Sequence, residues 1–239
     1  MECDNKVICG DSLDELKLLP AQHYKAVITD PPYFIGFNNS AKDGGGRQDL
    51  GNSTMLNPLF DALFTEIIRV LRKDGVLFMF TDWRTYPTLY NRLSRYMDIK
   101  NMIVWDFKWI KAGTHFRFSH ELIVYATMPE ATGPEDRTVR DVWDFKPINF
   151  TVARNHPAEK AVEIMEYMIQ HCTAPGEAIL DCFAGSGPTG IAAKKQNRRY
   201  TLIEINPDHV ATCEKRLQEV QVQTSLEKVQ PVGFEAWST

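Results

Sequence analysis

The tetrapeptide Asp30-Pro31-Pro32-Tyr33 places a carboxylate, two prolines and an aromatic ring directly after a short apolar run, Ala26 to Ile28. The run is typical of a buried strand. The two prolines lack N–H groups and restrict the backbone, so the strand must end in a stiff, non-helical loop. A ring beside carboxylate and carbonyl acceptors suits a flat partner that carries an NH2 group. The alternative is a simple proline turn, with Tyr33 in the core.

A second stretch combines glycines with an acid at a defined distance. Residues 178–180 predict a strand that leads into a glycine-rich turn, and Glu204 follows Gly185 by 19 residues. Glycines let a ligand approach the backbone, and an acid at this spacing can accept hydrogen bonds from ribose hydroxyls. Pro188 withdraws one helix N–H from any phosphate, which favours a nucleoside such as S-adenosylmethionine. The alternative is a tight turn with a surface glutamate.

The elements that must position both stretches alternate between apolar strands and amphipathic helices. This order predicts a mostly parallel sheet with helices on both faces, in which ligands bind beyond the carboxyl ends of the strands. Both stretches occupy such ends. Local signals predict Ser12 as an N-cap, Asn57 with Pro58 as a helix start, and Gly75 with positive φ as a helix stop.

Three further segments have distinctive compositions. The β-rich runs 101–109 and 121–126 are expected to pair as a hairpin at one end of the sheet, joined by a basic turn. Residues 34–57 contain a long polar, glycine-rich stretch, which indicates a mobile functional loop or a disordered one. Residues 128–155 carry mixed charge and few core signals.

The composition describes an ordinary globular protein, and 239 residues predict a single domain, 1–239. The net charge of −4 argues against a protein coated in positive charge, but it allows a local basic surface for nucleic acid. No apolar run is long enough to span a membrane. The five cysteines are scattered without a CxxC pair, so they indicate neither a disulfide framework nor a zinc site. We expect a cytoplasmic protein with reduced thiols.

Taken together, the motifs resemble those of amino-methylating DNA methyltransferases of the permuted (beta) order, of the kind found in restriction-modification systems. In that order the DPPY loop precedes the cofactor-binding FAGSG loop. The similar stretches are Gly10 to Ser12, Asp30 to Tyr33, Arg72 to Gly75, His120-Glu121, His156-Pro157 with Lys160, Asp181 to Gly187, and Glu204. The chain departs from the family at Cys182 and Ala161, where proline is usual, and at Pro188, where threonine is usual.

The resemblance implies a Rossmann-like methyltransferase fold, with a seven-stranded, mostly parallel sheet that contains one antiparallel strand. It also implies transfer of a methyl group from S-adenosylmethionine to the N6 amino group of an adenine flipped out of DNA, without a metal. The catalytic residues would be Asp30, Pro31, Pro32 and Tyr33. The cofactor-binding residues would be Asp11, Asp30, Lys160, Asp181, Phe183, Ala184, Gly185, Ser186, Gly187, Glu204 and Asn206.

Several alternatives stay open at this point. Asp11 and His156 can cap helices, and Lys160 can be a solvated helix charge. The target can be cytosine N4 or, as a weaker alternative, RNA or a protein amide, and the chain can be a non-catalytic DNA-binding subunit. A homodimer is common in the resembling family. Segments 34–57 and 128–155 are the candidates for reading bases, and their small size predicts a short or relaxed recognition sequence. Candidate phosphate contacts are the basic turn 108–120 and Lys194, Lys195, Arg198 and Arg199, although solvated helix and turn charges explain these residues equally well.

Overall fold

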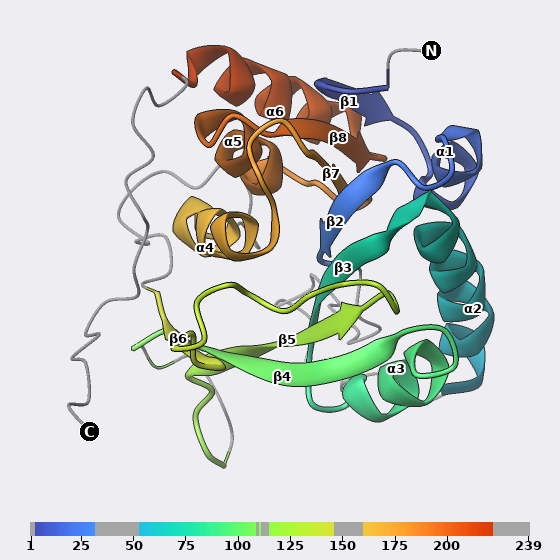
Figure 1. Ribbon diagram of the computed structural model, residues 1–239, viewed down its shortest axis with the longest axis vertical. Coiled ribbons are helices and arrows are strands. Elements are labelled where there is room, and N and C mark those ends of the chain that lie inside the picture. Colours follow the sequence, from blue (N-terminus) through green and yellow to red (C-terminus); the bar gives the residue numbers. More distant parts are fainter. Residues whose placement is uncertain (1–2, 32–52, 109, 111–114, 146–159, 222–239) are drawn as a thin grey trace, which may run out of the picture.

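The computed structural model describes residues 3–31, 53–108, 110, 115–145 and 160–221. In this part of the chain, one eight-stranded sheet has the order β1-β8-β7-β2-β3-β5-β4-β6 (Figure 1). The strands are β1 (Lys6–Cys9), β2 (Tyr24–Thr29), β3 (Leu71–Thr81), β4 (Asp98–Asp106), β5 (His120–Thr127), β6 (Val142–Asp144), β7 (Ala178–Asp181) and β8 (Arg199–Glu204). The helices are α1 (Ser12–Leu18), α2 (Ser53–Val70), α3 (Tyr86–Leu93), α4 (Val162–Cys172), α5 (Pro188–Lys195) and α6 (Pro207–Glu219).

Strand β5 runs antiparallel to both of its neighbours, β3 and β4, whereas the other described strand pairs are parallel. The mostly parallel sheet and the β4–β5 hairpin are therefore confirmed. The predicted count of seven strands is too low for the described residues. The additional strand, β6, has three residues and pairs with the outer edge of β4, and such a short run carries no periodic signal of its own.

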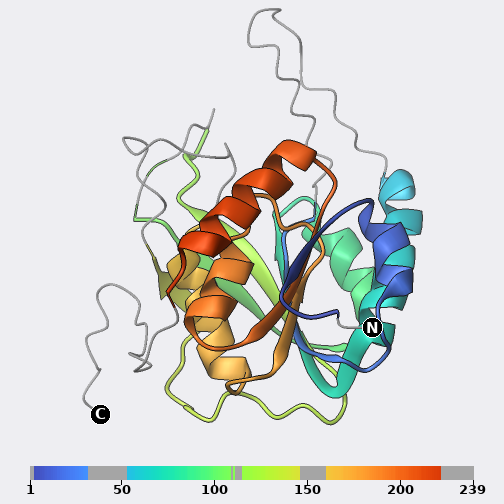
Figure 2. The same cartoon turned by 90° about the horizontal axis from the view of Figure 1, so that it is seen from above.

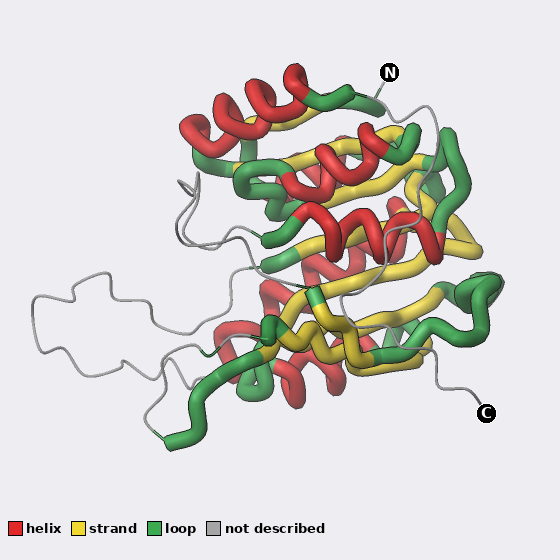
Figure 3. Tube along the Cα trace, turned by 90° about the vertical axis from the view of Figure 1, so that its left-hand side faces the viewer, coloured by secondary structure: helices red, strands yellow, loops and turns green. Residues whose placement is uncertain are grey.

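Helices cover both faces of the sheet, with α1, α2 and α3 on one face and α4, α5 and α6 on the other (Figures 2 and 3). Alternate side chains of the central strands enter two separate cores. In β3, for example, Phe78 and Phe80 pack with α4, whereas Leu77 and Met79 pack with α2. Burial on both faces explains why these strands read as continuous apolar runs. No helix of the described residues is long and apolar enough to cross a membrane.

The chain changes direction across the sheet between β7 and β2, which lie side by side. From β2 the chain continues outward to β3, and from β7 it continues to β8 on the opposite side. Such a switch point is where open parallel sheets bind their ligands.

Three predicted helix limits are wrong. Asp11, not Ser12, caps α1: its Oδ1 accepts from the Leu13 N–H at 2.8 Å, because Ser12 is turned inward and donates to the Cys182 carbonyl. Helix α2 begins at Ser53 and contains Pro58, so the helix continues through the predicted start signal. Gly75 lies inside β3 and lacks the predicted positive φ. A Cβ there would lie 2.9 Å from the Arg72 carbonyl oxygen, so close packing requires this glycine.

Candidate functional site

The two predicted stretches meet where β2 and β7 end. These strands pair in parallel, with Ala26 opposite Ile179. Beyond the pairing, the Thr29 hydroxyl lies 3.5 Å from the Cys182 thiol, which joins the two strand ends directly. Asp30 and Asp181 therefore lead into neighbouring loops at one edge of the sheet, and both loops follow the carboxyl ends of strands, as the sequence predicts.

Asp181 accepts two hydrogen bonds from residues in and after the glycine-rich loop. Its Oδ2 accepts from the Thr189 hydroxyl at 2.6 Å, and its Oδ1 accepts from the Phe183 N–H at 3.0 Å. Burial raises the pKa of this carboxyl to about 6, although the hydrogen bonds from Thr189 and Phe183 oppose the rise. Both oxygens thus bond within the protein, and Asp181 positions the loop that follows it.

Glu204 is bonded to the same loop from the end of β8. Its Oε2 accepts from the Gly185 N–H and its Oε1 from the Asn206 N–H, both at 2.8 Å. The His209 Nδ1 lies 3.6 Å from Oε1, and the Glu204 side chain is 11% exposed. Each carboxylate oxygen has two acceptor positions, so this oriented carboxylate retains the capacity to bind two neighbouring hydroxyls.

The two glycines of the loop differ in what surrounds them. Gly185 has a φ of +52° and no heavy atom within 4 Å of the place where a Cβ would stand. Gly187 has a φ of +82°, and a Cβ there would lie 2.2 Å from the Cys213 sulfur in α6. Open space therefore lies at Gly185, whereas Gly187 is required by packing against Cys213, and contact of either glycine with a cofactor stays a prediction.

The remaining loop residues are held by the protein. The Ala184 N–H donates to the Ile203 carbonyl at 2.9 Å. Ser186 is buried, and its hydroxyl accepts from the Arg216 guanidinium at 2.8 Å. Phe183 is partly buried against the core on the α1–α3 side.

Asn206 and Asp11 both cap helices next to this loop. Asn206 begins α6, where its Oδ1 accepts from the Asp208 N–H at 2.9 Å. Asp11 is exposed and begins α1, just beyond the point where Cys9 lies opposite Glu204 in the sheet. The capping geometry fixes where both side chains stand, and their contact with a cofactor stays a prediction.

Asp30 is part of a cluster of three charges from distant parts of the chain. The Lys160 ammonium lies 2.7 Å from Asp30 Oδ2 and 3.1 Å from Glu121 Oε2. Asp30 directly follows β2, Glu121 lies in β5, and Lys160 comes just before α4. The two carboxylates are about a quarter exposed, and the Lys160 side chain is 11% exposed.

The surroundings of Lys160 exclude a solvated helix charge. Its ammonium lies 5.0 Å from the centre of the Phe80 ring. Burial alone would lower the pKa of Lys160, but the Asp30 and Glu121 carboxylates outweigh burial and raise it above its ordinary value. Lys160 is therefore a buried cation that fixes the position of the Asp30 carboxylate.

Several predicted residues fall outside the described part of the chain, namely Pro32, Tyr33, His156, most of segment 34–57 and the end of segment 128–155. Pro31 is described and buried. In segment 128–155, Trp143 and Phe145 enter the core. Among the other tryptophans, Trp105 is also buried, Trp83 is 58% exposed, and Trp109 is outside the described residues.

The four basic residues near β8, which are candidate phosphate contacts, all have partners within the protein. Lys194 donates to the Leu217 carbonyl, Lys195 pairs with Glu166, Arg198 is buried, and Arg199 pairs with Asp4. Arg198 and Arg199 also lie at the amino end of β8, opposite the site. The described part of the basic turn leaves the carboxyl end of β4, and Lys108, His115 and Arg117 are exposed there.

Sequence reasoning missed the supporting residues. In the sequence, Glu121 stands out only as part of the His120-Glu121 stretch that resembles the family. Its contact with Lys160 joins positions 39 residues apart. Ser12, Thr29 and Thr189 also tie the strand ends together. The sequence indicates Ser12 only as an N-cap, and Thr29 and Thr189 carry no pattern that would single them out.

Comparison with known proteins agrees with this geometry. The sequence model of a family described as DNA methylase matches residues 24–215. The chain is 28% identical to DNA adenine methyltransferase YhdJ of Escherichia coli (strain K12), over 88% of this chain and 82% of that protein. It is 24% identical to Type II methyltransferase M.HpaI of Haemophilus parainfluenzae, over 90% and 74%.

Solved structures share the fold. The PvuII DNA methyltransferase, described as cytosine-N4-specific, has a TM-score of 0.72 at 16% identity, over 94% of this chain and 89% of that chain. The M1.HpyAVI–SAM complex has a TM-score of 0.66 at 21% identity, over 89% and 99%.

Proposed function

Because the chain belongs to the DNA methylase family, we propose that it transfers a methyl group from S-adenosylmethionine to the N6 amino group of an adenine flipped out of DNA. One observation carries this proposal. The Asp30 carboxylate follows β2, and the adjacent strand β7 leads into the loop whose Gly185 N–H donates to Glu204 at the end of β8. An acceptor for an amine and an acceptor for a ribose thus lie at the same edge of the sheet, with one strand between them.

The residues around Gly185 fit S-adenosylmethionine. Open space at Gly185 lets a ligand approach the backbone, and Glu204 is oriented to accept from ribose hydroxyls. Asp11 stands at the adjacent strand end, where it would bind the adenine of the cofactor. When bound, S-adenosylmethionine supplies an electrophilic methyl group on a sulfonium.

Asp30 and the Pro31 carbonyl would handle the target amine. The lone pair of the adenine N6 nitrogen is delocalised into the ring, so the nitrogen is a poor nucleophile. Two acceptors that each take one N–H favour a pyramidal nitrogen whose lone pair is available, and this help counts most if the hydrogen bonds strengthen in the transition state. Tyr33 would stack on the base, which must leave the duplex to reach the site.

Lys160 and Glu121 would keep Asp30 in the productive orientation. The ion pair at 2.7 Å fixes one Asp30 oxygen, and Glu121 fixes the ammonium in turn. A small displacement of an acceptor from its reacting partner is costly for catalysis. Lys160 therefore acts on the target side of the site, in addition to the role near the methionine end of the cofactor that the resemblance implies.

Adenine is favoured because aspartate opens the tetrapeptide, whereas serine is more typical of cytosine-N4 enzymes. The similarity to a protein named as a DNA adenine methyltransferase supports the same choice. Cytosine N4 is the second candidate, since a cytosine-N4-specific enzyme has the same fold.

The test compares wild type with Asp30→Ala in methyl transfer to DNA and in binding of S-adenosylmethionine. We expect transfer by the variant to fall about 100- to 1000-fold, because an acceptor for the transition state is lost. Cofactor affinity should stay within about threefold of wild type. Asp14→Ala, an exposed change on α1, is the control and should match wild type.

Mass spectrometry of nucleosides from the treated DNA identifies the product. N6-methyladenine supports the proposal, and N4-methylcytosine alone would replace it with the second candidate. A wild-type protein that neither transfers methyl groups nor binds the cofactor would be a non-catalytic DNA-binding subunit.

A further inference from the structure

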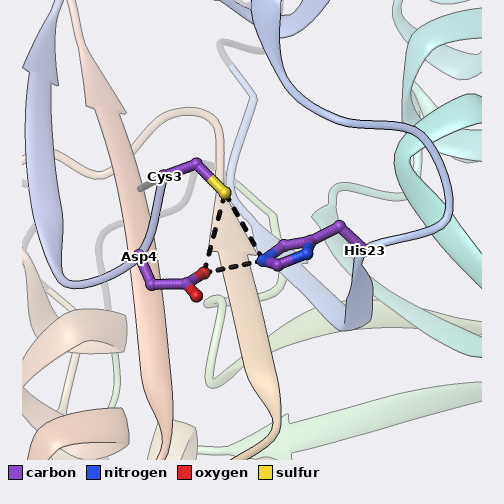
Figure 4. Close-up of side chains that lie close together, drawn as sticks. All are labelled: Cys3, Asp4 and His23. Carbon is purple, nitrogen blue, oxygen red and sulfur yellow. Dashed lines mark hydrogen bonds and ion pairs between the residues drawn. The ribbon is translucent and has the colours of Figure 1, made fainter. Parts of the chain in front are cut away.

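A cysteine, an aspartate and a histidine meet at the amino ends of the strands, away from the site described above. Cys3 and Asp4 precede β1, and His23 precedes β2 (Figure 4). The Cys3 sulfur lies 3.5 Å from His23 Nε2 and 3.8 Å from Asp4 Oδ1, and Nε2 lies 2.7 Å from Oδ1. Cys3 is buried, and the Asp4 and His23 side chains are 15% and 25% exposed.

These atoms do not form a nucleophilic triad. In such a triad the nucleophile and the acid bond to opposite nitrogens of the imidazole. Here the thiol and the carboxylate both face the same nitrogen, Nε2, so the carboxylate cannot orient the ring for proton transfer from the thiol. Three donor atoms that converge on one point are instead the arrangement of metal ligands.

We propose that Cys3, Asp4 and His23 bind one Zn²⁺. Zinc–ligand bonds of about 2.0–2.3 Å in a tetrahedron place the donor atoms about 3.3–3.6 Å apart. The two distances from sulfur are close to this range, and only the hydrogen-bonded pair Nε2–Oδ1 must lengthen when the metal replaces the shared hydrogen. The thiol loses its proton on binding, the imidazole presents Nε2 with its proton on Nδ1, and water completes the coordination.

Neighbouring residues already orient two of the proposed ligand residues. Arg199, at the start of β8, pairs with Asp4 through Oδ2, which leaves Oδ1 directed at the other two ligands. The Thr201 hydroxyl donates to the Cys3 carbonyl at 2.6 Å. Second partners of this kind orient metal ligands. A thiolate and a carboxylate together neutralise the charge of Zn²⁺.

Bound zinc would fasten the amino-terminal segment to the starts of β2 and β8. The sequence does not indicate this site, because no CxxC pair is present. His23 comes 20 residues after Cys3, and only the parallel arrangement of β1, β8, β7 and β2 brings the three ligands to one edge of the sheet.

The experiment uses the full chain without an affinity tag, freed of metal with a chelator and titrated with Co²⁺ and then Zn²⁺. We expect one Co²⁺ per chain with a thiolate-to-cobalt absorption band, displaced by one Zn²⁺, and a zinc-dependent rise in melting temperature. Cys3→Ser should lose the band and the rise. Cys9→Ser, which removes the exposed thiol at the other end of β1, should keep both.

His23→Gln should keep the thiolate band but bind cobalt at least about 10- to 100-fold more weakly, as expected for a lost ligand. This variant also decides the matter if Cys3→Ser does not fold. The proposal is overturned if folded wild type takes up no stoichiometric metal, or if Cys3→Ser or His23→Gln binds it as wild type does. The three residues would then form only a hydrogen-bonded cluster. Methyl transfer is a separate readout, since these residues lie at the opposite ends of the strands from Asp30.

Discussion

The loop after β7 and the loop after β2 occupy neighbouring strand ends but are held in different ways. The Gly185 loop is bonded through main-chain N–H groups to Asp181 and Glu204, which lie within a short stretch of the chain. Asp30 is fixed by a buried ion pair with Lys160, 130 residues away in sequence. The contacts that hold Gly185 thus come mainly from nearby sequence, whereas the position of Asp30 depends on the assembled sheet.

This difference predicts how each loop responds when one of its contacts is removed. A hydrogen-bonded loop of compact local contacts should tolerate the loss of one contact with a modest fall in ligand affinity. A buried charge cluster should fail sharply, since removing one partner leaves the others uncompensated. The following changes test that contrast, in order of decreasing expected effect.

Replacing Lys160 with methionine should have the largest effect. Two carboxylates would lose their shared cation, which we expect to destabilise the protein by about 3–5 kcal/mol. Methyl transfer should fall about 100-fold through displacement of Asp30. Urea unfolding and transfer kinetics measure the two effects. Lys160→Arg should recover part of both, and Lys17→Met, at an exposed ion pair, should match wild type.

Cofactor affinity separates two roles of Lys160. If the lysine acts on Asp30, the affinity of the folded Lys160→Met variant for S-adenosylmethionine should stay near that of wild type. Loss of affinity with an unchanged turnover rate would instead place its action at the methionine end of the cofactor.

The two loop glycines should respond differently to alanine. Gly187→Ala combines a left-handed φ with overlap on Cys213, which should cost about 3 kcal/mol in the free energy of unfolding. Gly185→Ala, with open space around it, should cost only about 1 kcal/mol. Its methyl group should weaken cofactor binding instead. Urea unfolding of both variants checks the difference, and Gly187→Ala with Cys213→Ala should recover part of the loss.

Asp181 should give the protein a pH dependence of stability. Because burial raises its folded pKa to about 6, above its ordinary value, the folded state binds more protons than the unfolded state between about pH 4 and pH 6. Stability from this group is therefore present below about pH 4 and is lost as the pH rises to about 6, by about 2–3 kcal/mol. Unfolding of wild type and Asp181→Asn across this range should show the difference. Parallel curves would contradict it.

The smallest effect is expected for Glu204→Gln. The amide keeps one oxygen to accept a loop N–H but loses the second acceptor and the charge, so S-adenosylmethionine should bind about tenfold more weakly, or about 1.4 kcal/mol. Calorimetric titration measures this. Glu214→Gln, an exposed change on α6, should bind as wild type does. An unchanged affinity in Glu204→Gln would remove Glu204 from the cofactor site.

The architecture was largely predictable because each of its signals is local. Alternating strands and helices implied the parallel sheet, and the order of the chain put Asp30 and Gly185 at strand ends. The helix limits at Ser12, Asn57 and Gly75 were less predictable. Tertiary contacts overrode the capping and turn preferences there, turning Ser12 inward and placing Gly75 against the Arg72 carbonyl.

The sequence by itself determined the chemical groups of the site and the strand ends from which they project, including the spacing between Gly185 and Glu204. The tertiary structure alone decided which charges and ligands face one another. It placed Lys160 between Asp30 and Glu121, and it brought His23 to Cys3 and Asp4. Partners of this kind are chosen by the order of strands in the sheet, which joins residues with no periodic or short-range relation in the chain.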